Sequence, residues 1–451
     1  MQTYFASLAV DQNYNELNFY KQIAIALLNL DLERREKIEK ASIIGWPILL
    51  KKTDQGFLVL DETLTITSKI VKYIYPPFKD IASEFSTIND TQTFISKVKK
   101  INLDHISSAE ISLVGLLNIE MEKVIKTARK KEEISYPILD SKISEHDVKV
   151  INENLVNLKS EILTTLTSLE VLLKEVEDTR IRIKRNLSDQ IEEINKKYKE
   201  LIENKTKEIE NEIQNASNDI SNSINNEVNS KVSKLTETLT RQAITSLKYE
   251  GGTIGKTEFE SSNKELETVI DEIRKIKDNV IEKYLEKVRY LKRDLDKLYA
   301  DRNNEIEKIN NMMREVDNVA NDFRNRANKA KENMESFVKY IDLFYEKLDL
   351  ADDTTVIIPF LIAKTNKGNV FVTTPQIYKG KAKGIFSKVF RKSELSEPLS
   401  NSLQVFVDQL KKIEINDNIK IYSAQINTAL EEIKAEGWKS IDTLEDIYTS
   451  A

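Results

Sequence analysis

The sequence contains no cysteine, which excludes disulfides, thiolate metal sites and cysteine nucleophiles. Its only histidines, His105 and His146, lie far apart, and no carboxylate cluster with ligand spacing accompanies either of them. No metal site is therefore expected. No serine lies in a G-x-S-x-G elbow. These absences predict a protein that is not an enzyme and that binds no cofactor.

Long apolar runs are also absent. The first residues, "MQTYFASLAV", lack the basic start and apolar run of a signal peptide. Runs such as "IAIALL" at 23–28 are too short to cross a bilayer. We therefore expect a cytoplasmic protein. The net charge of −6 provides no general attraction to nucleic acid, so any such contact would have to be local.

Glycine and proline are scarce, and their positions divide the chain. There are ten glycines and seven prolines in 451 residues, with none at 138–250 and none at 256–358. Between these two stretches lie Gly251, Gly252 and Gly255. This distribution predicts two long helices, at 145–247 and 258–350, joined by a glycine-rich tip turn at 248–257.

Apolar residues in both stretches recur at steps of three and four, which is the pattern of a coiled coil. A connection of about ten residues makes the two helices antiparallel, so the pattern predicts a hairpin about 130–150 Å long. At 211–233 the steps become fours, and 12 of 23 residues are Asn or Ser. We expect this to be the weakest part of the hairpin. The two expected seams are Ile162, Leu166, Leu169, Leu173, Val176, Leu187, Ile191, Ile194, Tyr198 and Leu201, and Val288, Leu291, Leu295, Leu298, Ile309, Met313, Val316, Ala320, Phe323, Ala327, Ala330, Met334, Phe337, Ile341 and Phe344.

The turn sequence "YEGGTIGKTEF" at 249–259 contains a Gly-Lys-Thr like the end of a phosphate-binding loop. The full phosphate-binding pattern requires glycine where this chain has Glu250. A phosphate-binding loop also follows a β-strand. The preceding residues instead predict a helix with Leu235, Leu239, Ala243 and Leu247 on one face. We therefore interpret the stretch as a plain turn in which Lys256 and Thr257 open the returning helix.

The two ends of the chain resemble each other. "PILLKKTDQGFLVLD" at 47–61 aligns with "PFLIAKTNKGNVFVT" at 359–373, and both predict a β-hairpin. "FISKVKKI" at 94–101 aligns with "FVDQLKKI" at 406–413 at the same offset of 312, and "ISSAEI" at 106–111 aligns with "IYSAQI" at 421–426. These matches predict an internal duplication.

The predicted fold is mainly α, with a small α+β head and a long antiparallel coiled-coil hairpin inserted between two duplicated modules. The first module, at 1–140, contains a helix, a β-hairpin and further helices, including an apolar helix at 112–125. The second module, at 354–451, duplicates about 43–125. Because one hairpin alone is marginally stable, the two modules are expected to pair at the base of the arm.

One segment has a strong local charge. No acidic residue occurs from Thr354 to Ser393, and the second module has a basic insert relative to the first. Three interpretations are open: phosphate contacts with nucleic acid, contact with an anionic membrane surface, and a solvated loop. The candidate contact residues are Lys379, Lys381, Lys383, Lys388, Arg391 and Lys392.

This layout resembles that of the SMC-type chromosome-organising proteins and their double-strand-break-repair relatives. In those proteins, globular halves from the chain ends meet at the base of an intramolecular coiled coil. The resemblance is one of architecture: the phosphate-binding loop, the ABC signature, the hinge domain and the paired-cysteine hook of those families have no counterpart in this sequence. It therefore implies no ATP hydrolysis.

The expected function is that of a non-enzymatic structural protein that bridges or spaces partners and associates with DNA through the basic insert. The alternative is a scaffold or tether subunit whose head docks on a partner protein, such as an ATPase or a membrane-surface assembly. A protein partner is expected in both cases, and the oligomeric state is open.

Overall fold

The structure is a computed structural model that describes residues 2–33, 35–131, 133–380, 395–438 and 443–449. The chain forms two compact units. Unit 1 comprises Met1–Ile81, Asn102–Leu172 and Asn325–Ala451, and unit 2 comprises Ala82–Ile101 and Leu173–Arg324.

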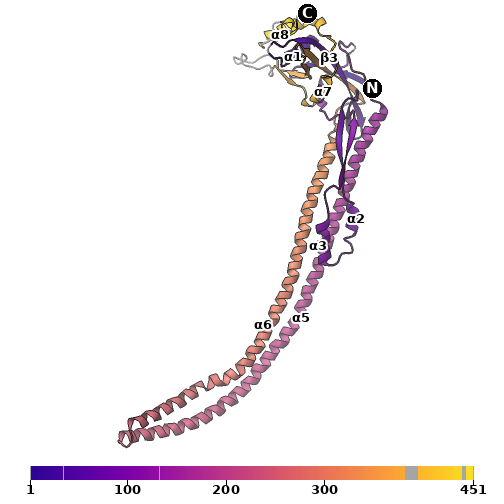
Figure 1. The fold of residues 1–451 in the computed structure, drawn as a ribbon. Helices are drawn as coiled ribbons and strands as arrows, with labels where there is room; N and C mark the ends of the chain where they lie inside the picture. Colours follow the sequence, from indigo (N-terminus) through magenta and orange to yellow (C-terminus); the bar gives the residue numbers. More distant parts are fainter. Residues whose placement is uncertain (1, 34, 132, 381–394, 439–442, 450–451) are drawn as a thin grey trace. The chain divides into compact units, whose positions relative to one another are not determined.

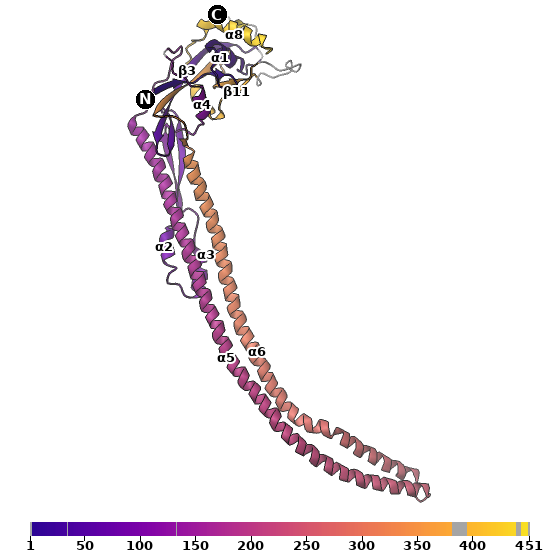
Figure 2. The same cartoon turned by 180° about the vertical axis from the view of Figure 1, so that it is seen from behind.

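Two long helices, α5 (Glu145–Glu250) and α6 (Lys256–Asp342), pack side by side (Figures 1 and 2). Ser144 caps α5: its backbone N–H and hydroxyl donate to the Asp147 carboxylate, and its hydroxyl accepts from the Asp147 N–H. The helix ends at the glycines, where Gly252 has a φ of +71°, a conformation that other residues rarely adopt. The returning helix ends at Asp342, eight residues before the expected boundary at 350.

Cross-helix ion pairs establish that α5 and α6 are antiparallel. Within unit 1, Lys159 pairs with Asp342 and Glu170 with Lys331, both at 2.5 Å. Within unit 2 the pairing continues toward the turn, so residue numbers rise on one helix as they fall on the other. The cross-helix pairs of unit 2 are Glu177–Arg324, Arg180–Asp317, Lys184–Asp317, Lys205–Asp294, Glu212–Lys287, Lys231–Glu272, Lys234–Glu272 and Arg241–Glu265.

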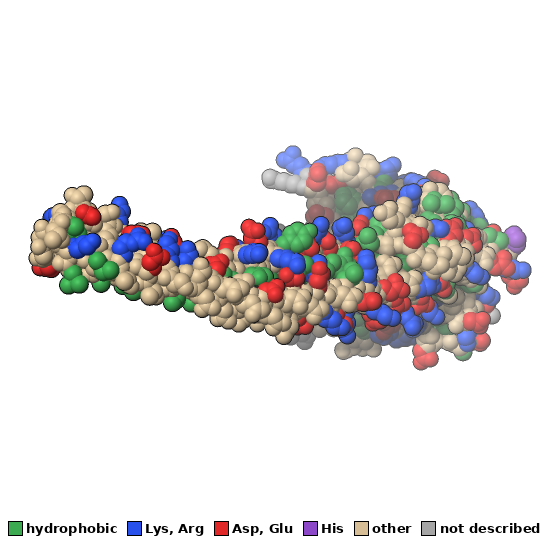
Figure 3. Space-filling model, turned by 90° about the horizontal axis from the view of Figure 1, so that it is seen from below, with side chains coloured by type: hydrophobic (Ala, Val, Ile, Leu, Met, Phe, Trp, Pro, Cys, Tyr) green, Lys and Arg blue, Asp and Glu red, His purple; other side chains and the backbone are tan. Residues whose placement is uncertain are grey.

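The two helices bury most of the apolar positions that the sequence pattern selects. Charged side chains of both signs are spread over the exposed surface, with some hydrophobic side chains among them (Figure 3). Of the expected seam positions, those buried on α5 are Ile162, Leu166, Leu169, Val176, Leu187 and Tyr198, and those on α6 include Leu291, Ile309, Val316, Ala320, Phe323, Ala327, Met334 and Ile341. Leu172 and Ile183 are buried in addition, whereas the expected Leu201 is 41% exposed. In the Asn/Ser-rich stretch 211–233 the only buried α5 residue is Ala216, which gives this part little apolar contact.

Unit 1 is built on a six-stranded sheet. Its centre consists of β3 (Ile38–Thr53) and β8 (Thr354–Thr365), which pair antiparallel with Trp46 opposite Ile358. These residues differ by the same 312 positions as the two aligned sequence ends. The flanking strands are β4 (Gly56–Asp61) beside β3, β9 (Val370–Thr373) and β1 (Gln2–Phe5) beside β8, and β7 (Tyr345–Glu346) beside β4.

Both expected β-hairpins are present, as β3–β4 and β8–β9. Each turn has glycine at its end, and Gly368 has a φ of +84°. Along β3 the side chains alternate, so Ile44, Trp46 and Ile48 contribute to one apolar cluster while Leu49 contributes to another. The hairpins therefore form the centre of the sheet and supply the core of unit 1.

Helices cover the sheet on both faces. One cluster contains α1 (Phe19–Leu28), α8 (Ser423–Ala435) and the short α9 (Leu444–Ile447). The opposite cluster contains α4 (Glu122–Thr127), η3 (Asn401–Phe406) and α7 (Val407–Leu410), with Trp46 against Phe406 at 5.0 Å. A third cluster joins the first turns of α5 and the last turn of α6 to β4 and to the β5–β6 hairpin (Thr67–Ile74 and Ser107–Val114).

Two sequence predictions are wrong within the first module. The expected helix at 112–125 is the end of β6 followed by an irregular segment, and α4 begins only at Glu122. Gly115, at φ +87°, interrupts the segment, and its N–H and C=O bond to Ile66 and Asp61 instead of to a helix. The aligned "ISSAEI" and "IYSAQI" also differ in structure, since the first lies in β6 and the second in η4 (Lys420–Tyr422) and α8.

In unit 2, α3 (Thr91–Lys100) lies along α5 (Figures 1 and 2). It follows the connection from α2 (Phe78–Ser83), and it buries Phe94 and Val98. Arg182 of α5 donates from Nη2 to the backbone carbonyls of Phe85 and Ile88 at 3.0 and 2.9 Å. These bonds hold the connection against α5.

Candidate interaction sites

The basic insert begins where β10 ends. Strand β10 (Gln376–Tyr378) pairs antiparallel with β11 (Ser396–Pro398) and parallel with β2 (Ala9–Val10). Of the six candidate contact residues, the structure describes only Lys379. The others, Lys381, Lys383, Lys388, Arg391 and Lys392, lie outside the described residues.

Lys379 is engaged within unit 1 on both its backbone and its side chain. Its N–H donates to the Leu395 carbonyl at 3.1 Å, and its carbonyl accepts from Gln12 Nε2 at 2.8 Å. Its ammonium lies 3.6 Å from the Glu397 carboxylate. An acidic group therefore already balances this cation, which lowers its value as a phosphate contact.

Contacts from α1 and from the residues that follow α8 hold the start of the insert in place. The Tyr378 hydroxyl donates to Glu436, and Trp438 Nε1 donates to the Gly380 carbonyl. Lys21 pairs with Glu436 at 2.8 Å and lies 5.3 Å from the centre of the Tyr378 ring. Burial and the neighbouring Glu436 carboxylate raise the pKa of Tyr378, so its hydroxyl stays a donor.

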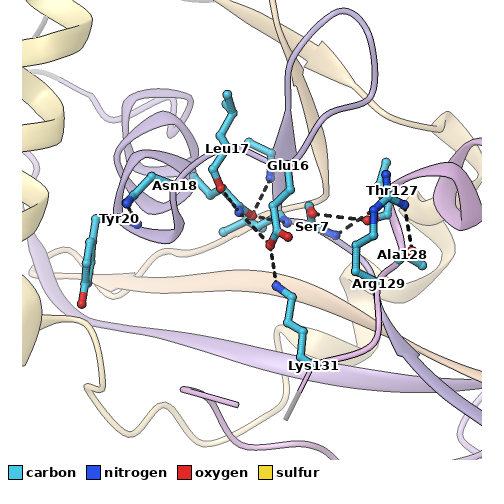
Figure 4. A network of polar contacts seen from close by, with 12 residues as sticks. Ser7, Glu16, Leu17, Asn18, Tyr20, Thr127, Ala128, Arg129 and Lys131 are labelled. Carbon is cyan, nitrogen blue, oxygen red and sulfur yellow. Dashed lines mark hydrogen bonds and ion pairs between the residues drawn. The ribbon is translucent and has the colours of Figure 1, made fainter. Parts of the chain in front are cut away.

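A polar network fixes β2, the strand beside β10 (Figure 4). Gln22 of α1 is buried, and its side-chain carbonyl accepts from the Leu8 and Ala9 N–H groups at 2.8 and 3.2 Å. Its amide donates to the Leu17 carbonyl and to Glu16, which pairs with Lys131 at 2.5 Å. Hydrogen bonds and an ion pair therefore hold β2, the neighbour of β10, in a fixed position.

The turn between α5 and α6 is stabilised by its own contacts. The Gly251 N–H donates to the Leu247 carbonyl at 3.0 Å, and the Tyr249 and Phe259 rings stack at 4.8 Å. Lys256 is exposed, starts α6 and lies 3.5 Å from Glu260 one turn later. The Gly-Lys-Thr sequence therefore joins two helices, in contrast to the strand-to-helix setting of a phosphate-binding loop.

Near this turn, α5 does not use the apolar face that its sequence marks. Leu239 and Leu247 are 45% and 75% exposed. The contacts to α6 come instead from polar residues: the Gln242 amide donates to Asn263 at 2.8 Å, and Arg241 pairs with Glu265 at 3.0 Å. Thr238 is buried. Periodicity located the apolar face correctly, but it does not reveal which face of α5 meets α6.

His105 lies beside two tyrosine rings, with centroids 4.8 Å from Tyr73 and 6.4 Å from Tyr75. Together with Asp104 it lines a cavity of about 300 Å³ that Arg326 also borders. Both Asp104 and His105 are exposed. His146 is also exposed, in the first turn of α5. Among the described residues, no group of three or more histidines and carboxylates is arranged to hold a metal ion.

Comparison of the chain with protein-family models, with curated proteins and with solved structures finds no match. Within the described part of the chain, no helix is long and apolar enough to cross a membrane.

Proposed function

We propose that the chain is a non-enzymatic structural protein that bridges or spaces two partners, one at the sheet of unit 1 and one near the α5–α6 turn. In this proposal α5 and α6 form an antiparallel coiled-coil hairpin. The main support for this hairpin is the series of cross-helix ion pairs, from Lys159–Asp342 in unit 1 to Arg241–Glu265 in unit 2. Because the two helices of one chain pair with each other, such a hairpin needs no second chain. The sheet of unit 1 and the α5–α6 turn then stay available for contacts with partners.

We further propose that the two β-hairpins descend from one duplicated module. Support comes from the pairing of β3 with β8, in which Trp46 faces Ile358, its aligned counterpart. Two equivalent antiparallel strands that pair at equivalent residues are related by a local twofold axis. The outer strands β4 and β9 follow the same relation, since β4 pairs with the second half of β3 and β9 with the second half of β8.

DNA is the proposed partner of the basic insert, and the test is a gel-shift with the full chain at low salt. Replacing all six candidate residues by Ala should abolish binding or weaken it strongly. If all six residues contact phosphates, a plot of log affinity against log salt concentration should be less steep in the variant than in wild type, by roughly five units of slope. A charge-matched control replaces six exposed lysines elsewhere: Lys196, Lys197, Lys199, Lys207, Lys275 and Lys277. Equal losses in both variants, or no binding at all, would refute the DNA role.

The alternative function is a scaffold or tether subunit with a protein partner. The contact between Lys379 and Glu397 favours it, because it reduces the free positive charge at the base of the insert. Capture of the partner by the full chain would then be unchanged by nuclease treatment. Nucleotide-dependent stabilisation that disappears in Lys256→Ala would instead revive an enzymatic role.

A further inference from the structure

A cavity of about 580 Å³ lies within unit 1, between the end of β3 and the first turns of α5. Its volume suits a small organic molecule. Neither the basic insert nor the α5–α6 turn contributes to its lining. Part of its wall is apolar and consists of Leu49, Leu58, Ile143 and Val148.

A buried carboxylate lies on the sheet side of this cavity. Glu62, which lines the cavity, is only 4% exposed, and its Oε1 accepts a hydrogen bond from the Thr355 hydroxyl at 2.6 Å. Thr355 is itself buried and lies opposite Leu49 in the pairing of β3 with β8. Residues that lie opposite each other point to the same face of a sheet. Thr355 therefore holds the Glu62 carboxylate on the face from which Leu49 lines the cavity.

Among the described residues, the Thr355 hydroxyl is the one hydrogen-bond partner of the Glu62 carboxylate, and no lysine or arginine forms an ion pair with it. Within the same residues Oε2 has no donor, yet it is not one of the polar atoms that are sealed from solvent. A charged group buried this deeply is costly unless a partner of opposite charge compensates it. The open side of this carboxylate is therefore suited to a cation.

The lysines that line the cavity are already engaged. Lys51 pairs with Asp353 at 2.7 Å, and the Lys52 ammonium donates to a backbone carbonyl at 2.7 Å. Lys149 lies 3.8 Å from Glu153, one turn later on α5. An anionic ligand would have to displace these contacts, whereas a cationic ligand meets an acceptor that is still open.

We propose that the cavity binds a primary ammonium group carried on a short aliphatic chain, and that Glu62 is its counter-ion. The ammonium donates to Glu62 Oε2, which gives the buried carboxylate a charge-assisted hydrogen bond. The methylene groups of the ligand lie against the apolar wall, which includes Leu49 and Val148. This site goes beyond the proposed bridging function and does not depend on it.

Titration calorimetry with the full chain tests the class of ligand. Butylamine should bind saturably at one site, whereas butanol and butyrate, which have a similar chain but no positive charge, should bind roughly tenfold more weakly or worse. Cadaverine and Nα-acetyl-lysine amide carry the same ammonium as a free diamine and as a lysine side chain, and the tighter of the two identifies the source. Equal binding of all probes, preferential binding of butyrate, or no saturable binding of any ammonium compound would overturn the proposal.

Substitution of Glu62 tests whether it is the counter-ion. Glu62→Gln keeps an acceptor for the Thr355 hydroxyl but removes the charge, and it should weaken the binding of butylamine roughly tenfold or more. The control is Glu39→Gln, the same change of charge at an exposed position of β3 outside the cavity, which should leave the affinity unchanged. Circular dichroism verifies that each variant keeps its helix content.

A second variant tests the cavity without touching its charge. Ser141→Trp adds bulk at an exposed residue of the lining and should also weaken the binding of butylamine, so the site can be tested even if Glu62→Gln does not fold. Unchanged affinity in a folded Glu62→Gln variant or in Ser141→Trp would show that the ammonium binds elsewhere. The gel-shift concerns other residues, so the two proposals fail separately.

Discussion

Asp61 shows how a single residue organises the loop that follows β4. The residue is fully buried, and its Oδ1 accepts hydrogen bonds from Trp46 Nε1 at 2.7 Å and from the N–H and hydroxyl of Thr63. Its Oδ2 accepts from the N–H and hydroxyl of Thr65 and from the Ile66 N–H. A buried carboxylate of this kind is stable only because donors surround both oxygens.

Asp61→Asn should destabilise the protein by about 2–4 kcal/mol, because an amide group replaces one accepting oxygen and leaves buried donors without a partner. The free energy of unfolding, measured with urea, checks this. Asp54→Asn, in the exposed turn of the same hairpin, is the control and should change stability little. Equal stabilities of the two variants would show that the network is dispensable.

A basic residue in the sequence is available to a partner only if no acidic group of the chain already pairs with it. Lys379 belongs to the most basic segment of the chain, yet it lies near Glu397, and its backbone bonds to Leu395, just before β11, and to Gln12. Neither neighbour is close to it in the sequence. Charge patterning alone therefore overestimates the number of free cations at the base of the insert.

At the scale of elements, α3 depends on contacts that local sequence does not specify. Arg182 donates to two backbone carbonyls in the connection before α3, and the Thr179 hydroxyl donates to one of them, that of Phe85. The apolar contribution comes from Phe94 and Val98, which are fully buried. A short helix of ten residues is marginal alone, so this docking determines whether it is ordered.

Arg182→Ala should loosen α3 while leaving the long helices paired. The change leaves the Phe85 and Ile88 carbonyls without their arginine donor, at a cost of about 1–3 kcal/mol. Amide hydrogen exchange in residues 91–100 should accelerate roughly tenfold or more, since local opening becomes easier by that amount. Arg185→Ala, three residues away and exposed, is the control. Unchanged exchange at 91–100 in Arg182→Ala would show that apolar packing alone holds α3.

The helices and strands also show which parts of the fold the sequence predicts and which it does not. The positions of the two long helices followed from missing glycine and proline, although α6 ends at Asp342 instead of at 350. The hairpins followed from alternating apolar residues around Thr-x-x-Gly turns. The segment at 112–125 was mispredicted because its apolar residues suit either state, and pairing of β6 with β5 decides between them. The exposure of Leu239 and Leu247 on α5 was not predicted for a related reason: periodicity marks an apolar face, whereas the partner helix determines which face is covered.

At the scale of the whole molecule, the central claim is that α5 and α6 of one chain pair with each other. Two helices of one chain joined by a five-residue turn, 251–255, meet at a very high effective concentration. Ion pairs at corresponding positions then select the antiparallel register, although each exposed pair contributes little by itself. The buried apolar residues between them supply most of the stability.

This pairing can be tested with cysteines, because the natural chain has none. The Lys331 ammonium lies 2.5 Å from the Glu170 carboxylate across the helix pair. A short bifunctional thiol reagent should therefore join the two cysteines of the double variant Glu170→Cys with Lys331→Cys within one chain. The product should keep the monomer mass on a denaturing gel. In Glu170→Cys with Lys308→Cys the second site lies more than six helical turns along α6, and no such intramolecular product should form. A mixture of the single variants Glu170→Cys and Lys331→Cys should give no linked dimer. A dimer in that mixture would instead mean that α5 of one chain pairs with α6 of another, and the closed hairpin would be wrong.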